Sequence, residues 1–224
     1  MALLDDTPLR RAAVRGVIRY FHATLEGVEH LPARGGALLV GNHAMMGLDG
    51  VVLGALVLHQ ADRRVRFLGE RNLWRIPGVR SLLDAAGALP GEPGAATRLL
   101  RAGEVCGVYP GGIDDSWKLT RTERYRLKWG DRRGFAKVAM QAGVPIVPVA
   151  AFGIDEMYDV VAKERWVGRR VLGHARYDLP LALGWKGTLI PRRHPQRYVM
   201  LPPIATDGEV ERAEDVERVR RATH

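Results

Sequence analysis

Short apolar runs alternate along the chain with segments whose apolar residues recur at helical spacing. Continuous runs bounded by glycine or polar residues are typical of strands buried on both faces of a sheet, and they occupy 37–40, 65–68, 105–109, 145–151 and 198–201. The periodic segments predict helices at roughly 48–59, 72–85, 95–102 and 133–141. Because strand and helix alternate, we expect an α/β fold with a mostly parallel central sheet covered by helices.

Each end of the chain is predicted to form a helix. Thr7 before Pro8 is a helix-start signal, and the apolar and arginine residues of 9–21 fall largely on opposite sides. Such a helix can lie on an anionic membrane or pack on the protein's own core, and the pattern does not choose between them. The expected organisation is an amphipathic N-terminal helix (1–30) that could contact a membrane, an α/β domain (31–206) and a C-terminal helix (207–224).

Composition fits one globular domain. The 224 residues are 46% hydrophobic and 26% charged, which excludes disordered and collagen-like chains. The single cysteine excludes an internal disulfide framework and a cysteine-rich zinc site, and it suits a reducing cytoplasm. Arginines interrupt the apolar core that a signal peptide requires, and no stretch reaches the roughly 18 apolar residues of a membrane span. The apolar stretch 51–58 therefore predicts a buried helix.

Positive charge is concentrated in one segment. The formal net charge is +9, and residues 117–137 hold eight basic residues against two acidic ones. Such a field attracts polyanions, anionic membranes or acidic ligands, although a solvated surface loop is the alternative for this segment. No nucleic-acid recognition motif accompanies the arginines, so we expect no nucleic-acid partner.

Several kinds of enzyme lack their signatures here. Ser81 and Ser116, the two serines, stand outside the Gly-x-Ser-x-Gly motif of serine hydrolases. Cys106 lies inside a strand pattern, where a small buried thiol is expected rather than a nucleophile. No P-loop or dinucleotide-binding glycine motif is present. A metal is not expected either, because His43 and Asp49 have no further ligands near them in the sequence.

The first candidate site follows the predicted strand at 37–40. His43 stands just beyond the strand end, where ligands bind in open α/β sheets, and Asp49 follows six residues later. A histidine held by a carboxylate is the usual way to obtain a neutral base with a fixed tautomer. On one helix the two side chains would point about 120° apart, so His43 must lie in a loop that Gly47 allows to curl. Alternatively, His43 caps the strand and Asp49 simply starts the next helix.

The second candidate site follows the predicted strand at 105–109. Tyr109 is followed by Pro110, Gly111 and Gly112, and adjacent glycines let backbone amides approach a phosphate or an oxyanion closely. A plain strand-ending turn is the alternative. The basic segment that follows points to an anionic ligand, such as a nucleotide-bearing acyl carrier or a phospholipid head group.

Taken together, these motifs resemble the glycerolipid acyltransferase superfamily in order and spacing. The matching segments are Gly41-Asn42-His43 with Asp49, then 67–78 with 87–90, then 108–112, then 133–137 and 143–149, within about 38–203. The Pro-Gly-Gly turn, in place of Glu-Gly-Thr, is most similar to the diacylglycerol and phytyl-ester acyltransferase-like branch. The resemblance implies a single-domain α/β fold of the acyltransferase type.

The resemblance also implies the transfer of a fatty acyl group from a thioester, acyl-CoA or acyl carrier protein, to the hydroxyl of a lipid-like alcohol. No cofactor is implied beyond this co-substrate. By that resemblance His43 takes the proton of the acceptor hydroxyl, while Asp49 orients the imidazole. The implied substrate-binding residues are two arginines that could hold a phosphate and the turn whose amides face the carbonyl oxygen, namely Arg71, Arg133, Tyr109, Gly111 and Gly112.

Some choices stay open. One residue more than usual for the family separates His43 from Asp49, so Glu70 is an alternative partner for the imidazole. The lysophosphatidate branch carries an arginine near Pro90 and a glutamate near Pro110, and both are absent, so the acceptor is undecided. A non-catalytic lipid- or polyanion-binding module on the same scaffold is the alternative function.

We expect a cytoplasmic protein, peripheral on the inner face of a membrane. Without a predicted span, contact with lipid would be monotopic. The sequence offers the N-terminal helix and two apolar pairs, Met45-Met46 and Leu73-Trp74, as contact sites.

Overall fold

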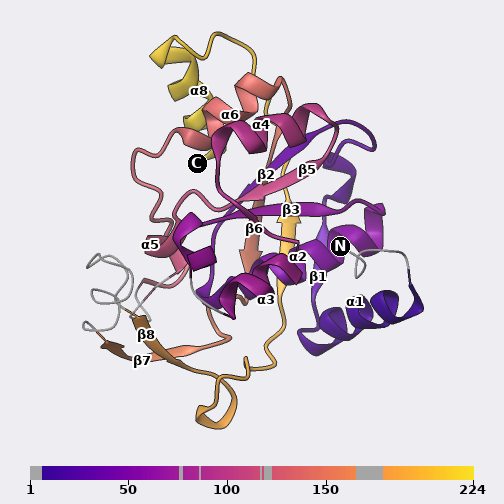
Figure 1. The fold of residues 1–224 in the computed structure, drawn as a ribbon, viewed down its shortest axis with the longest axis vertical. Helices are drawn as coiled ribbons and strands as arrows, with labels where there is room; N and C mark the ends of the chain where they lie inside the picture. Colours follow the sequence, from indigo (N-terminus) through magenta and orange to yellow (C-terminus); the bar gives the residue numbers. More distant parts are fainter. Residues whose placement is uncertain (1–6, 76–77, 86, 117, 119–122, 165–178) are drawn as a thin grey trace.

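The computed structural model, which describes residues 7–75, 78–85, 87–116, 118, 123–164 and 179–224, is built around a mostly parallel sheet (Figure 1). The sheet has 7 strands in the order β1-β9-β6-β2-β5-β3-β4. Their bounds are Thr24–Glu26 (β1), Ala37–Gly41 (β2), Val65–Gly69 (β3), Leu89–Pro90 (β4), Val105–Val108 (β5), Ile146–Phe152 (β6) and Arg197–Met200 (β9). Pairing is parallel throughout except between β6 and β9, so the predicted fold class is confirmed.

Helices cover both faces of this sheet. The α-helices are α1 (Pro8–Tyr20), α2 (Leu48–Ala61), α3 (Val79–Ala85), α4 (Pro93–Arg101), α5 (Gly112–Ser116), α6 (Gly134–Ala142) and α8 (Ala213–Thr223). Short 3-10 turns are η2 (Val28–His30), η3 (Met45–Gly47), η4 (Arg71–Arg75) and η7 (Trp185–Gly187), and β7 (Asp159–Glu164) pairs antiparallel with β8 (Leu179–Leu183) in a separate sheet. None of the described helices combines the length and the apolar composition needed to cross a membrane.

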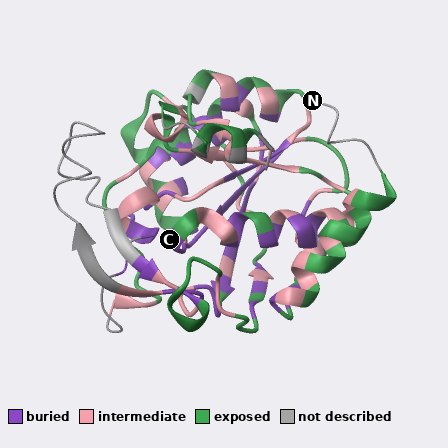
Figure 2. Cartoon of the chain, turned by 60° about the horizontal axis from the view of Figure 1, so that its bottom comes forward, coloured by how far each residue is buried: buried purple, intermediate pink, exposed green. Residues whose placement is uncertain are grey.

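The central strand β2 shows why a continuous apolar run predicts a strand buried on both sides. Every residue of β2 is buried, and its side chains alternate between two apolar clusters. Leu39 packs with α2, β1 and β9, whereas Leu38 and Val40 pack with α4, α6 and α8. The buried residues accordingly follow the central strands in Figure 2. Period-two alternation across a pleated strand produces this division.

The C-terminal ends of the parallel strands gather at one edge of the sheet, here named the carboxyl edge. The residue pair Phe152 and Arg197 lies at this edge, because β6 ends there and the antiparallel β9 begins there. Thr24 pairs with Arg197, so β1 also begins at the carboxyl edge. Segments that precede β1 and β9 therefore reach the same region as segments that follow β2, β5 and β6.

The terminal helices form as predicted, with different degrees of packing. The Thr7 hydroxyl accepts a hydrogen bond from the Arg10 amide at 3.2 Å, which confirms the helix start. α1 has no buried residue, and Leu9 is 75% exposed, while its C-terminal half rests against the core. In α8, Val216 and Val219 are both buried, as their spacing predicts.

Two sequence predictions need correction. The helix expected over 72–85 is interrupted, because Gly78 adopts a φ of +82° between η4 and α3. Residues 76–77 lie outside the described residues. The strands β1, β4, β7 and β8 were not predicted. β1 is only three residues long and is defined by pairing with β9, which lies far away in sequence and is invisible to local pattern.

The helix α2 provides a test of the core. Leu56 is 1% exposed, so Leu56→Ala should lower the free energy of unfolding by about 2–5 kcal/mol through lost burial and a residual cavity. Val51, on the same helix, is 42% exposed, and Val51→Ala should change that free energy by no more than about 0.5 kcal/mol. Urea unfolding of both variants measures the difference. Equal losses would contradict the assigned packing face of α2.

Candidate active site

His43 and Asp49 form a hydrogen-bonded pair at the carboxyl edge. His43 Nδ1 lies 2.9 Å from Asp49 Oδ2, the Asp49 side chain is fully buried, and the His43 side chain is 18% exposed. His43 stands in the loop after β2, while Asp49 lies in the first turn of α2. The loop curls through Met46 and Gly47, whose φ values are 65° and 68°. The predicted loop geometry is therefore confirmed.

The pair fixes one tautomer of the imidazole. A carboxylate can only accept, so Nδ1 carries the proton and Nε2 keeps its lone pair free for a substrate proton. The first turn of a helix also favours a negative charge, because the backbone amides there point toward it. Glu70, the alternative partner, instead accepts a hydrogen bond from the Asn72 side chain at 3.5 Å. The structure thus pairs His43 with Asp49.

Aromatic stacking holds the plane of the imidazole. The ring of Tyr109 stacks on His43 with 4.2 Å between centroids and 9° between planes. Phe67 stacks behind Tyr109 at 5.6 Å. Gly107 makes room for this stack, since a Cβ there would stand 2.5 Å from the Phe67 ring. Burial, and then the charge of Asp49, raise the pKa of Tyr109 well above its usual value, so the phenol stays neutral.

A buried amide fixes the chain immediately before His43. The Asn42 side chain donates to the Ala151 carbonyl oxygen and accepts from the Ala151 amide, both at 2.8 Å. These two bonds continue the ladder between β2 and β6 beyond the end of β2. The direction in which the chain leaves the sheet is thereby set, and His43 begins its loop from a rigid point.

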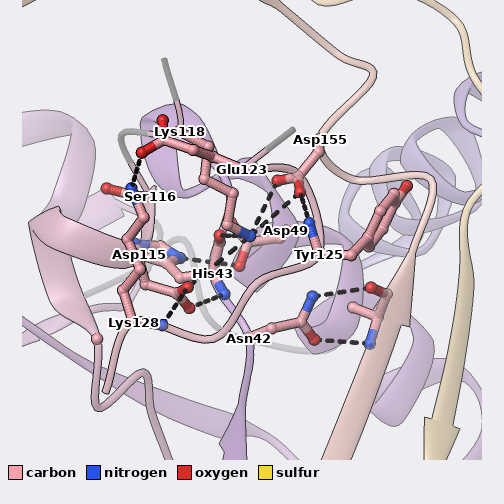
Figure 3. A network of polar contacts seen from close by, with 12 residues as sticks. Asn42, His43, Asp49, Asp115, Ser116, Lys118, Glu123, Tyr125, Lys128 and Asp155 are labelled. Carbon is pink, nitrogen blue, oxygen red and sulfur yellow. Dashed lines mark hydrogen bonds and ion pairs between the residues drawn. The ribbon is translucent and has the colours of Figure 1, made fainter. Parts of the chain in front are cut away.

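Charged side chains form hydrogen bonds with the backbone of His43 (Figure 3). Asp115 Oδ2 accepts from the His43 amide at 2.9 Å, and Lys118 Nζ donates to the His43 carbonyl oxygen at 3.4 Å. Lys118 also lies 3.1 Å from Asp155 Oδ2, and Tyr125 donates its amide to the same oxygen. The side chains of Asp115, Lys118 and Asp155 are each at most 5% exposed.

This buried network was not predicted from the sequence. The Lys118 ammonium pairs with both carboxylates, and backbone amides donate to their oxygens, which is the condition under which buried charges are tolerated. Burial raises the pKa of Asp155, although the neighbouring Lys118 opposes the shift. The only local signal was an aspartate pair, Asp114-Asp115, just after the glycine turn. Nothing in that pair indicates which carboxylate faces inward.

The other predicted site residues are placed as follows. The Gly112 amide donates to the Tyr109 carbonyl oxygen at 2.9 Å and is therefore used within the turn. The Gly111 amide donates to no acceptor among the described residues. Arg71 pairs with Glu92 at 3.8 Å, and Arg133 pairs with Glu217 at 3.1 Å. Within the described part of the chain, neither arginine contacts His43 or Asp49.

The basic segment is largely neutralised. Residues 117 and 119–122 lie outside the described residues. Arg124 pairs with Asp159, Lys128 with Glu123 and Arg132 with Asp114. Much of the positive charge expected to receive an anionic ligand is thus engaged within the protein.

Comparison with known proteins gives consistent matches. A family model described as Acyltransferase matches residues 22–151. The chain is 28% identical over 201 residues to the human "DGAT1/2-independent enzyme synthesizing storage lipids", covering 88% of this chain and 58% of that protein. It is 33% identical over 172 residues to an uncharacterized protein of Mycobacterium leprae (strain TN), covering 73% of this chain and 47% of that protein. The chain thus spans about half the length of the curated relatives that it matches.

A solved structure shares the fold. The 1-acyl-sn-glycerophosphate (LPA) acyltransferase PlsC from Thermotoga maritima superimposes with a TM-score of 0.57 at 16% identity. The match covers 98% of this chain and 81% of the Thermotoga chain.

Asp115 is predicted to stabilise the His43 loop. In Asp115→Asn, one carboxylate oxygen that accepts the amide of His43 or Lys128 becomes an NH₂ group facing a donor. The free energy of unfolding should fall by about 1–3 kcal/mol. Asp114→Asn is the matched control, because the Asp114 side chain is 44% exposed, and it should cost less than about 1 kcal/mol. Urea unfolding compares the two, and a larger loss at Asp114 would contradict the assignment.

Cys106 is predicted to be inert in the folded protein. Its side chain is fully buried in β5, and burial raises the pKa of its thiol to about 11. Near neutral pH the reactive thiolate is therefore scarce as well as inaccessible. A colorimetric disulfide reagent should react with Cys106 only after unfolding in guanidinium chloride. Rapid reaction of the native protein would reopen Cys106 as a candidate nucleophile.

Proposed function

The chain belongs to the acyltransferase family and has its fold, and on that premise we propose that it moves a fatty acyl group from an acyl thioester to the hydroxyl of a lipid-like acceptor, with His43 as general base. The observation that carries the proposal is the hydrogen bond of 2.9 Å between His43 Nδ1 and Asp49. In the neutral imidazole this bond keeps the proton on Nδ1, so the lone pair is on Nε2, in a side chain that is 18% exposed at the carboxyl edge.

The proposed reaction is a direct transfer. Nε2 of His43 takes the proton of the acceptor hydroxyl while that oxygen attacks the carbonyl carbon of the thioester. The tetrahedral intermediate collapses with cleavage of the carbon–sulfur bond, and the leaving thiolate takes the proton back from the imidazolium. Asp49 stabilises the imidazolium between these two proton transfers. The products are an ester and a free thiol, and no covalent enzyme intermediate is required.

The Gly111 amide is our candidate for stabilising the carbonyl oxygen. This oxygen gains negative charge in the transition state, so a donor placed near it contributes more to the reaction than to ground-state binding. Gly111 stands two residues after Tyr109, and Tyr109 stacks on His43, so the Gly111 amide belongs to the turn beside the proposed base. The Gly112 amide is a weaker candidate because it already donates to Tyr109.

We propose acyl-CoA or an acyl carrier protein as donor, and a neutral alcohol as acceptor at a membrane surface. Both arginines expected to hold an acceptor phosphate, Arg71 and Arg133, are paired with glutamates. The glutamates partly neutralise these arginines and so weaken their attraction for a phosphate, whereas a neutral alcohol needs no cation. The human relative is named as an enzyme that synthesizes storage lipids. No cofactor is part of the proposed reaction.

The non-catalytic binding module has lost its sequence support. Its argument was the extra residue between His43 and Asp49. In the structure the additional length is taken up by consecutive left-handed residues, Met46 and Gly47, and the pair still forms.

His43→Ala should lower turnover by about 10²–10⁴-fold, because the general base is removed. Asp49→Asn should also lower turnover, since an asparagine cannot stabilise the imidazolium. The matched control is His59→Ala, at the exposed C-terminal end of α2. Turnover is measured as thiol release from acyl thioesters in the presence of lipid alcohols, alongside circular dichroism to confirm folding. A folded His43→Ala protein with the turnover of the parent would refute His43 as the base.

A further inference from the structure

We propose that residues 184–190, here named the Trp185 loop, dock the protein on an anionic lipid surface with the carboxyl edge facing the bilayer. The loop connects β8 to the segment that leads into β9, and it forms the lowest part of the molecule in Figure 1. The inference deepens the proposed function, because a lipid alcohol can reach His43 from a bilayer only if this edge faces it.

The loop exposes large apolar side chains at its tip. Trp185 is 50% exposed, Leu189 70% and Ile190 50%. Single exposed apolar residues are ordinary, but clustered ones mark interaction surfaces or membrane contacts. Tryptophan in particular is enriched where one side of a surface is apolar and the other wet.

This exposure is a built feature of the loop. Gly184 and Trp185 donate their amides to the carbonyl oxygens of Thr188 and Ile190, both at 2.7 Å, which closes the loop on itself. A Cβ at Gly184 would stand 1.9 Å from the Ile190 oxygen, so the closure requires glycine there. The Tyr158 hydroxyl also donates to the Leu189 carbonyl oxygen at 2.9 Å. The backbone is thus held by the body of the protein while the apolar side chains remain in solvent.

Basic side chains accompany the apolar tip. Lys186 Nζ lies 4.9 Å from the centroid of the Trp185 ring. The guanidinium carbon of Arg193 lies 5.5 Å from the centroid of the Tyr20 ring. Among the described residues neither cation forms an ion pair with a carboxylate. Each unneutralised cation near a surface of anionic lipid contributes about 1 kcal/mol of attraction. The combination of exposed indole, aliphatic side chains and unpaired cations fits the interface of an anionic bilayer.

The loop lies at the same edge as the candidate active site. The segment that follows it enters β9 at Arg197, opposite the end of β6 and therefore at the carboxyl edge. Further apolar side chains are exposed around this edge, on the segments that follow β2 and β5 and at the end of β6: Met46, Tyr125, Leu127 and Phe152. Tyr125 and Phe152 are neighbours, with 6.4 Å between ring centroids.

The contact residues expected from the sequence fit less well. Met45 is buried in the core, with only Met46 of that pair exposed. Leu73 and Trp74 are half-buried, and the Trp74 indole donates to Asp84 at 2.8 Å. In the N-terminal helix Leu9 is exposed, but Val17, Ile18 and Tyr20 rest against the core. The structure therefore shifts the expected membrane contact from these segments to the Trp185 loop.

The test is binding of the full chain to vesicles of phosphatidylcholine with or without phosphatidylglycerol, measured by co-sedimentation. The loop variant is Leu189→Asp. Leu201→Asp is the matched control, because Leu201 is 44% exposed at the opposite end of β9. Leu9→Asp tests the N-terminal helix. Trp185→Phe tests depth, since brominated lipid acyl chains quench an indole that enters the bilayer.

The parent protein should bind vesicles that contain phosphatidylglycerol and bind pure phosphatidylcholine more weakly. Leu189→Asp should weaken binding by about tenfold or more, from lost apolar burial and added negative charge. Leu201→Asp and Leu9→Asp should bind like the parent. Brominated lipid should quench the parent's fluorescence, and Trp185→Phe should remove that quenching. Parental binding by Leu189→Asp, or loss of binding in Leu9→Asp alone, would overturn the proposal. The proposal would also be overturned if the parent bound no vesicles and instead self-associated in solution, with Leu189→Asp abolishing that self-association.

A second measurement separates this inference from the proposed function. With short-chain, water-soluble thioester and alcohol, Leu189→Asp should turn over like the parent, whereas with acceptor in vesicles its turnover should fall with its binding. A parent that binds vesicles through the loop but transfers no acyl group would refute the proposed function and leave the docking surface standing. If the parent transfers acyl groups but Leu189→Asp does not change vesicle binding, the docking surface would be refuted and the proposed function would stand.

Discussion

The hydrogen bond between the buried Asp49 carboxylate and His43 is the interaction on which the candidate site depends. Burying a carboxylate is costly unless donors and favourable dipoles surround it. Here the imidazole Nδ1–H donates to Oδ2 and the first turn of α2 contributes a favourable dipole, while Oδ1 has no hydrogen-bond partner among the described residues. In return the carboxylate selects one tautomer and holds the ring, so that a single lone pair is presented to a substrate. The pair is thus also a constraint on how the chain must leave β2.

That constraint explains the surrounding structure. Asn42 extends the ladder to β6, Asp115 and Lys118 hold the two backbone groups of His43, and Tyr109 covers one face of its ring. These groups come from two segments of the chain, one that follows β2 and one that follows β5. Their common place is the carboxyl edge of the sheet, where the ends of parallel strands gather irrespective of their distance in sequence. Rigid support of this kind is what a general base requires, since small displacements of a catalytic group cost turnover steeply.

The candidate active site and the Trp185 loop both lie at the carboxyl edge. Helices α4, α6 and α8 pack against one face of the sheet and α1 and α2 against the other. The basic segment after β5, which seemed a ligand site, is used instead for internal ion pairs. Lys186 and Arg193, which form no ion pair within the described part of the chain, lie with exposed apolar side chains on the Trp185 loop and the residues that follow it. Under the proposed function, a lipid surface at this edge would bring a water-insoluble alcohol and His43 into the same region.

The sequence by itself determined the fold class, the central strands and the position of His43 just beyond the end of a central strand. Apolar runs such as 37–40 can be satisfied only between two helical layers, and a histidine just beyond such a run has few alternatives but the sheet edge. It also indicated that Asp49, if it met His43, had to do so across a curled loop. Local pattern suffices for these features because burial on both faces and backbone geometry act within a few residues.

Only the tertiary structure decided the rest. Pairing of β1 with β9, the choice of Asp49 over Glu70, the inward turn of Asp115 beside the outward Asp114, and the exposure of Leu189 all depend on segments distant in sequence. The local sequence around a charged residue does not show whether its side chain is exposed to solvent or buried against a partner. Its environment is fixed only when the sheet brings the separate loops together, and that long-range packing is what local periodicity does not contain.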